Sequence, residues 1–212
     1  FVRLVRCVGR LCGQRLLWLG WVLFLSGCAL GPSLPEDARL LSDVSYAERA
    51  TGRLTGRLFL PAAQGPSPAV LLLHGGGWRN GSPQQMDLIA RRLVSEGFVV
   101  FSAAYRLAPG TRYPGQLEDV RAAFAWLADR PEVDPERMAA WGYSAGAQLA
   151  LLLGLNPVTG EPRPRAVVAG GAPAAFGLFD GKSRLLVNYL GAPRSKAPGT
   201  WSDASPVEWV SQ

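Results

Sequence analysis

Four short apolar runs, each separated from the next by a helical pattern, limit the folds that this chain can adopt. The runs cover residues 69–73, 98–104, 137–141 and 166–169. Apolar residues on one helical face recur between the first three runs, at Met86, Ile89, Ala90 and Leu93, and again at Leu117, Val120, Phe124 and Leu127. Strands separated by single helices form parallel units with right-handed crossovers. An α/β fold is therefore predicted, with a mostly parallel central sheet and helices on both faces.

The ends of these elements carry further signals. Ser82 can cap the first helix, with Pro83 at its opening position. A third helix is expected from about residue 144 to 153, ending near Gly154 and Pro157. Residues 51–60 have a weaker strand pattern and predict an antiparallel starting strand or hairpin.

A Gly-x-Ser-x-Gly pentapeptide, Gly142-Tyr143-Ser144-Ala145-Gly146, joins the third apolar run to the third helix. A turn this sharp brings backbone close to backbone, so side chains at Gly142 and Gly146 would collide. The turn would present the Ser144 hydroxyl and place the Ala145 N–H at a helix N-terminus, where negative charge is favoured. A chance pentapeptide in a chain rich in glycine and alanine is the alternative. The strand–turn–helix context favours Ser144 as a nucleophile.

A run of three glycines, His74-Gly75-Gly76-Gly77-Trp78, directly follows the first apolar run. Glycine lets the backbone approach an acyl oxygen closely, and N–H groups there can stabilise an oxyanion. A phosphate-binding loop would need G-K-[ST] or G-x-G-x-x-G opening a helix, and neither follows here. This HGGG-type segment therefore predicts the oxyanion loop of an esterase or lipase.

Several shorter segments accompany these two motifs. They are Asn80-Gly81, Ala104-Tyr105-Arg106-Leu107-Ala108, Tyr113-Pro114, Glu118-Asp119-Val120 and Asp134-Pro135-Glu136-Arg137. From about residue 54 to 210, the combination resembles the hormone-sensitive-lipase-like and feruloyl-esterase-like bacterial carboxylesterases of the α/β-hydrolase superfamily.

The resemblance implies a role for each matching residue. The nucleophile is Ser144, the oxyanion donors are Gly76, Gly77 and Ala145, and His74 and Gly75 support the oxyanion loop, with Gly75 the poorer donor. The chain departs from the family at Ala147-Gln148, where many relatives have Gly-His. We expect this difference to affect packing more than chemistry.

The catalytic partners of Ser144 are not evident in the sequence. Acyl transfer by serine needs a base and a carboxylate that orients it, and in α/β hydrolases both follow the serine along the chain. His74 is the only histidine, and its place on the oxyanion loop argues against a role as base. Asp180 and Asp203 are interpreted as solvated loop residues. We expect the acid and the histidine beyond residue 212, in a longer reading frame, so that the sheet ends at the strand 166–169 with its last strands missing.

Three hypotheses about function remain. The first is hydrolysis of small carboxylic esters through an acyl-enzyme, with no cofactor and no metal. The second is amide or peptide hydrolysis on the same fold. The third is a catalytically dead binding lipoprotein, if the chain truly ends at Gln212. Residues 172–201 are interpreted either as a cap facing the substrate or as a connecting helix, near 183–190, between ordinary loops.

The first 27 residues have the order of a lipoprotein-type signal peptide. Residues 1–15 are basic and residues 16–25 are strongly apolar, a core too short for a membrane span of about 20 residues. Leu25-Ser26-Gly27-Cys28 resembles a lipobox, which implies lipid attachment at Cys28 and a location in the bacterial cell envelope, in the outer membrane or facing the periplasm. An ordinary signal peptide and an uncleaved anchor are the alternatives. Residues 28–43 are interpreted as a tether and residues 44–212 as the hydrolase domain, incomplete at its C-terminus.

The charge distribution argues against a nucleic-acid partner. Four of the 22 basic side chains lie in residues 1–15, and no acidic residue precedes Glu36. The rest of the chain is almost balanced and has no basic stripe with interleaved aromatic residues. The three cysteines of the sequence lie at positions 7, 12 and 28. Neither a disulfide framework nor a thiolate metal site is therefore expected in the hydrolase domain, residues 44–212. The oligomeric state is left open.

Overall fold

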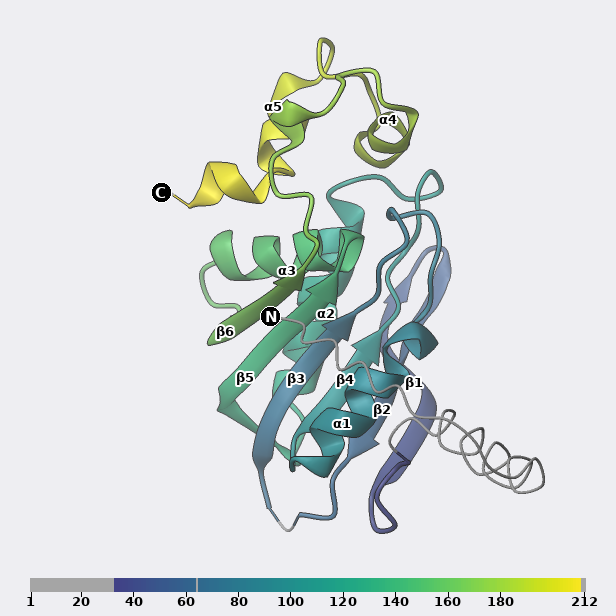
Figure 1. Ribbon diagram of the computed structural model, residues 1–212, viewed down its shortest axis with the longest axis vertical. Coiled ribbons are helices and arrows are strands. Elements are labelled where there is room, and N and C mark those ends of the chain that lie inside the picture. The colour runs from purple at the N-terminus through teal and green to yellow at the C-terminus, as the bar shows by residue number, and fades with distance from the viewer. Residues whose placement is uncertain (1–32, 64, 211–212) are drawn as a thin grey trace, which may run out of the picture. The chain divides into compact units, whose positions relative to one another are not determined.

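The computed structural model describes residues 33–63 and 65–210 (Figure 1). The sheet and its helices lie in one compact unit that begins at Leu34. The predicted signal peptide, residues 1–27, and the predicted lipid-attachment residue Cys28 lie outside the described residues. Within the described residues, no helix is both long enough and apolar enough to cross a membrane.

The described part of the chain forms one six-stranded sheet in the order β1-β2-β4-β3-β5-β6. Its strands are β1 (Arg39–Arg49), β2 (Gly52–Leu60), β3 (Ser67–Leu73), β4 (Val99–Ala103), β5 (Val133–Tyr143) and β6 (Ala166–Gly170). β3 pairs in parallel with β4 and β5, and β5 pairs in parallel with β6, whereas β2 pairs antiparallel with β1 and with β4. The predicted mostly parallel sheet is confirmed, as is the antiparallel hairpin expected around residues 51–60.

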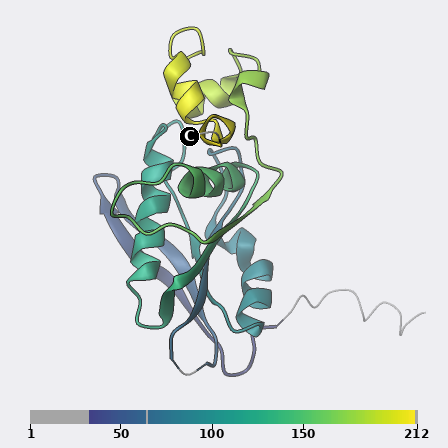
Figure 2. The same cartoon turned by 90° about the vertical axis from the view of Figure 1, so that its left-hand side faces the viewer.

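Helices lie on both faces of the sheet, as Figure 2 shows from the side. They are α1 (Asp87–Ser95), α2 (Gly115–Ala128), α3 (Ala145–Leu155), α4 (Arg184–Leu190) and α5 (Pro198–Asp203), with 3₁₀ turns η1 (Pro83–Met86), η2 (Phe176–Leu178) and η3 (Pro206–Trp209). Because neighbouring side chains on a strand point to opposite faces, Val70 and Leu72 of β3 pack toward α1, whereas Leu71 and Leu73 pack toward α2 and α3. Both faces of β3 are therefore buried.

The segment that follows β6 crosses the carboxyl ends of the parallel strands (Figure 1). The Tyr113 N–H donates to the carbonyl of Tyr189 in α4 (2.8 Å), and the Val207 N–H of η3 donates to the Ala174 carbonyl (3.1 Å). α3 also contacts η3. These contacts hold α4, α5 and η3 over the edge of the sheet where ligands bind in open α/β sheets.

Two expectations from the sequence are corrected by the structure. β1 begins at Arg39, so the tether predicted for residues 28–43 extends too far. The strand is difficult to recognise because two register shifts interrupt the alternation of its apolar residues. Ser82 has an extended backbone before η1 but makes no capping hydrogen bond, although Pro83 does open that turn. β6 is the outermost strand of the described sheet, as expected, and is therefore only partly buried, with Val168 52% exposed.

Candidate active site

Ser144 occupies a strained position between β5 and α3. Its backbone has φ 52° and ψ −116°, a region that residues with a side chain rarely adopt. Two hydrogen bonds hold it there: its N–H donates to the Gly170 carbonyl of β6 (2.7 Å), and its carbonyl accepts from the Gln148 N–H of α3 (3.1 Å). The surrounding strand and helix therefore fix the direction in which Ser144 faces.

The two glycines of the pentapeptide are required by contacts between backbones. A Cβ atom on Gly142 would lie 2.1 Å from the carbonyl oxygen of Gly146. One on Gly146 would lie 2.3 Å from the carbonyl oxygen of Leu73, at the end of β3. The start of α3 consequently packs directly against the strand that leads into the oxyanion loop.

The glycine loop lies beside Ser144. A Cβ atom on Gly75 would be 3.4 Å from the Cβ of Ser144, and one on Gly76 would be 2.1 Å from the Asn80 carbonyl oxygen. Gly76, Gly77 and Trp78 have φ values of 118°, 59° and 58°. Glycine is needed at Gly76 by both its φ and this close approach. The structure thus brings the predicted oxyanion loop and the predicted nucleophile together.

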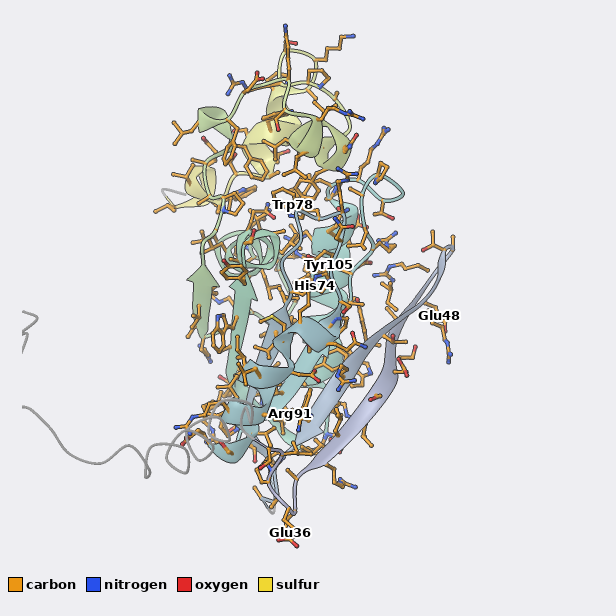
Figure 3. All side chains as sticks on the ribbon, turned by 45° about the vertical axis from the view of Figure 1, so that its right-hand side comes forward. Glu36, Glu48, His74, Trp78, Arg91 and Tyr105 are labelled. Atoms are coloured by element: carbon orange, nitrogen blue, oxygen red, sulfur yellow. The ribbon has the colours of Figure 1, made fainter. Side chains whose placement is uncertain are left out.

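His74 lies behind that loop, as Figure 3 shows with its neighbour Tyr105. Its imidazole stacks on Tyr105 with ring centroids 4.3 Å apart, and its Nδ1–H donates to the Gly75 carbonyl (2.7 Å). The Tyr105 hydroxyl donates to the His74 carbonyl (2.8 Å). Burial lowers the pKa of His74, and a weaker opposing effect comes from its hydrogen bond to Gly75. These contacts fit His74 as a support of the loop.

A cavity of about 390 Å³ opens in front of Ser144. Its lining comes from the glycine loop, the turn at Ser144, the segment after β6 and the start of α4: Gly77, Trp78, Ser144, Gly171, Ala172, Pro173, Phe179, Ser183, Leu185 and Leu186. A Cβ atom on Gly77 would be only 3.1 Å from Leu185, so α4 closes against the loop. Residues 183–190 thus contain the expected helix, and that helix also faces the cavity. The lining is mostly apolar and suits an aliphatic or aromatic group.

A buried carboxylate fixes the position of Tyr105; its segment, Glu118-Asp119-Val120, belongs to the motifs named above, but no role was predicted for it. Asp119 of α2 is fully buried, and both of its oxygens accept from the Arg106 guanidinium (2.7 and 2.8 Å). The same carboxylate accepts from the Arg106 backbone N–H (3.0 Å) and from Arg49 of β1 (3.0 Å). Because Tyr105 precedes Arg106, this charge cluster holds the residue on which His74 stacks.

The structure adds no carboxylate partner for Ser144 among the residues that it describes. Asp180 and Asp203 are both exposed, but Asp203 is the last residue of α5 and not in a loop as predicted. Asp180 accepts from the Lys182 backbone N–H (3.0 Å). Within residues 33–63 and 65–210, no hydrogen bond joins His74 to Ser144, and no group of three His, Cys, Asp or Glu side chains could hold a metal ion.

Comparison with known proteins identifies the family. A family model described as BD-FAE matches residues 57–212. The chain belongs to the BD-FAE family.

Two curated relatives of this BD-FAE chain are named as ester hydrolases. It is 34% identical over 137 residues to the ethyl acetate hydrolase of Pseudomonas putida, a match that covers 61% of the chain and 43% of the relative. It is 29% identical over 169 residues to esterase LipC of Mycobacterium tuberculosis, covering 69% of the chain and 41% of the relative. The chain thus spans less than half the length of these relatives. They place it, at the level of the family, among carboxylesterase-type hydrolases.

Solved structures confirm the fold of the BD-FAE chain. Esterase B from Lactobacillus rhamnosis, inhibited by a tributyrin phosphonate, has a TM-score of 0.71 at 23% identity, over 91% of this chain and 68% of that one. A thermophilic esterase from Thermogutta terrifontis, with propionate bound, has a TM-score of 0.66 at 21% identity, over 83% of this chain and 69% of that one. The predicted α/β-hydrolase fold is therefore correct.

Proposed function

We propose that the protein hydrolyses small carboxylic esters through an acyl-enzyme on Ser144. The observation that carries the proposal is that Ser144 and Gly77 open onto the same largely apolar cavity, with the serine held in a strained turn at the start of α3. Such a site suits an ester with an apolar acyl or alcohol group. The names of two curated relatives, an ethyl acetate hydrolase and an esterase, support the same class of substrate.

In the proposed reaction, the Ser144 Oγ attacks the ester carbonyl carbon while a base takes the hydroxyl proton. The N–H groups of Gly76, Gly77 and Ala145 stabilise the oxyanion. Collapse of the tetrahedral intermediate breaks the bond to the alkoxide, which leaves with the proton from the base. Water then attacks the acyl-enzyme with help from the same base, and Ser144 regains its proton as the carboxylic acid is released.

The base in this proposal is a histidine oriented by a carboxylate, both located beyond residue 212. Two observations support that location. His74 is the only histidine in the sequence, and its Nδ1 already donates to Gly75. Both curated relatives described above are more than twice as long as the segment they share with this chain.

Ester and amide substrates distinguish the hypotheses. We expect the complete gene product to hydrolyse 4-nitrophenyl acetate and butyrate, and to be slower by orders of magnitude on 4-nitroacetanilide, because the amine is the poorer leaving group. Release of nitrophenol or nitroaniline measures each rate. Comparable kcat/KM values on ester and amide would favour an amide hydrolase. Binding of the ester without turnover would favour a binding protein.

We also propose that Cys28 carries a lipid that anchors the protein in the bacterial cell envelope, facing the periplasm. The basic and apolar order of residues 1–25 and the Leu25–Cys28 sequence support this proposal. Cells expressing the protein and supplied with a labelled fatty acid should yield a labelled, membrane-associated product, and Cys28→Ser should abolish the label. An unlabelled product would leave an ordinary signal peptide or an uncleaved anchor as the explanation.

A further inference from the structure

One fully buried amide side chain connects the oxyanion loop to the segment that covers the cavity. Gln148 lies in the first turn of α3, and its backbone N–H donates to the Ser144 carbonyl. Its Oε1 accepts from the indole Nε1–H of Trp78 (3.0 Å) and from the Tyr189 hydroxyl of α4 (3.3 Å). Its Nε2 donates to the Ala204 carbonyl, just after α5 (2.7 Å). Three separate parts of the chain therefore meet on Gln148.

Trp78 needs such support. It follows Gly77 directly, is 2% exposed and has φ 58°, a conformation that persists only where the surroundings enforce it. Its indole is stacked on Tyr189 with ring centroids 4.2 Å apart and an angle of 6° between the planes. Phe176 packs against the same indole in a T-shaped arrangement, with ring centroids 5.6 Å apart. Figure 3 shows Trp78 between the sheet and the C-terminal helices.

The chemistry at this position calls for one acceptor and one donor on the same neutral side chain. An indole N–H can only donate and the Ala204 carbonyl can only accept, so a glutamine amide satisfies both. A carboxylate would bury a charge and lose the donor, and an apolar side chain would leave both partners unsatisfied in the core. Gln148 is thus matched to the Trp78 donor and the Ala204 acceptor and is not simply filling space.

We propose that Gln148 is a positioning residue for the oxyanion loop: by holding Trp78 against Tyr189, it fixes the backbone at Gly77 and couples that backbone to the segment over the cavity. The inference rests on the proposed ester hydrolysis. Gln148 does not touch the substrate, so its effect is expected in the transition state, where the oxyanion develops, more than in ground-state binding.

The test compares Gln148→Met with Gln116→Met. Gln116 is also fully buried in the first turn of a helix, α2, where its amide donates to the Thr111 carbonyl (2.7 Å), and it has no place in the site. In the complete gene product, Gln148→Met should lower kcat for 4-nitrophenyl butyrate about 10–100-fold with KM little changed, because a small misplacement of oxyanion donors has this scale of effect. Gln116→Met should leave kcat within about twofold. An unchanged kcat in Gln148→Met, or an equal loss in both variants, overturns the proposal.

A measurement without turnover separates this inference from the proposed function. In the wild-type protein the Trp78 indole N–H should be protected from hydrogen exchange in an NMR spectrum, with Trp78→Phe identifying its signal. Gln148→Met should accelerate that exchange, and Gln116→Met should not. Unchanged protection in Gln148→Met overturns the inference even if the wild-type protein hydrolyses esters. A wild-type protein without esterase activity refutes the proposed function, and hydrogen exchange then still reports whether Gln148 fixes Trp78.

If Gln148→Met does not fold, Gln148→His provides a second route. A neutral imidazole also carries one donor and one acceptor, so this variant should retain kcat within about tenfold of wild type. Trp78→Phe keeps the aromatic stack but removes the indole donor, and it should lower kcat about as much as removal of the amide. Full kcat in Trp78→Phe contradicts the proposal.

Discussion

Replacement of Ser144 by alanine is expected to reduce kcat/KM for ester hydrolysis by at least about 10³-fold, since no acyl-enzyme can form without the hydroxyl. The fold should be retained, because the hydrogen bonds that hold residue 144 come from its backbone N–H and carbonyl and not from its side chain. The measurement is the rate of 4-nitrophenol release by the complete gene product, together with its thermal melting. Activity within tenfold of wild type would exclude Ser144 as the nucleophile.

A glycine at the same position provides the control for stability. Because Ser144 has φ 52°, its side chain adds strain that glycine would not have, and single residues in such regions cost about 1–3 kcal/mol. Ser144→Gly should therefore be as inactive as Ser144→Ala but melt at a higher temperature. A lower melting temperature for Ser144→Gly would show that the turn is not strained at this residue.

Gly146→Ala is expected to destabilise the protein by about 3 kcal/mol or more, at the upper end of the range for overpacked cores. The new methyl group would lie 2.3 Å and 2.5 Å from the carbonyl oxygens of Leu73 and His74, which belong to the backbone and cannot rotate away. Separation of α3 from the end of β3 would relieve the contact only by moving Ser144 away from the glycine loop. Esterase activity should therefore fall together with stability.

Gly199→Ala is the matched control for that substitution. Gly199 lies in α5, and a Cβ atom there meets no atom within 4 Å. Its expected effect is neutral or slightly stabilising, because alanine reduces the freedom of the unfolded chain. Midpoints of urea unfolding measure both variants. Equal midpoints for Gly146→Ala and wild type would contradict the packing of α3 on β3.

The parts of the fold that could be predicted from the sequence are those encoded by local patterns. The pentapeptide around Ser144 spans five residues, β3 and β4 are short apolar runs, and α1 and α2 each carry apolar residues at helical spacing. β1 was missed because register shifts between Leu41 and Val44 and between Ser45 and Ala47 interrupt the period-two alternation of its apolar residues. Its burial pattern shows only Tyr46 as buried.

The polar contacts around the site could not be predicted, because each joins residues that are far apart in the sequence. Gln148 meets Trp78 across 70 positions and Ala204 across 56. Asp119 is 70 positions from Arg49. The sequence predicts that position 148 affects packing more than chemistry, because it follows the turn at Ser144. Its hydrogen-bond partners come from the tertiary structure and are not visible in that local pattern.

The order of strands in the sheet has a consequence for synthesis on the ribosome. β3 lies between β4 and β5, and β2 pairs with β4. β2 is therefore synthesised before β4, and β3 is synthesised before both of the strands with which it pairs. The hairpin of β1 and β2 has no sheet to join until Ala103 has left the exit tunnel, and β3 stays open on one side until Tyr143 follows. During translation the apolar residues of β3 are thus exposed for many codons, a period in which a holdase chaperone would protect the nascent chain from aggregation.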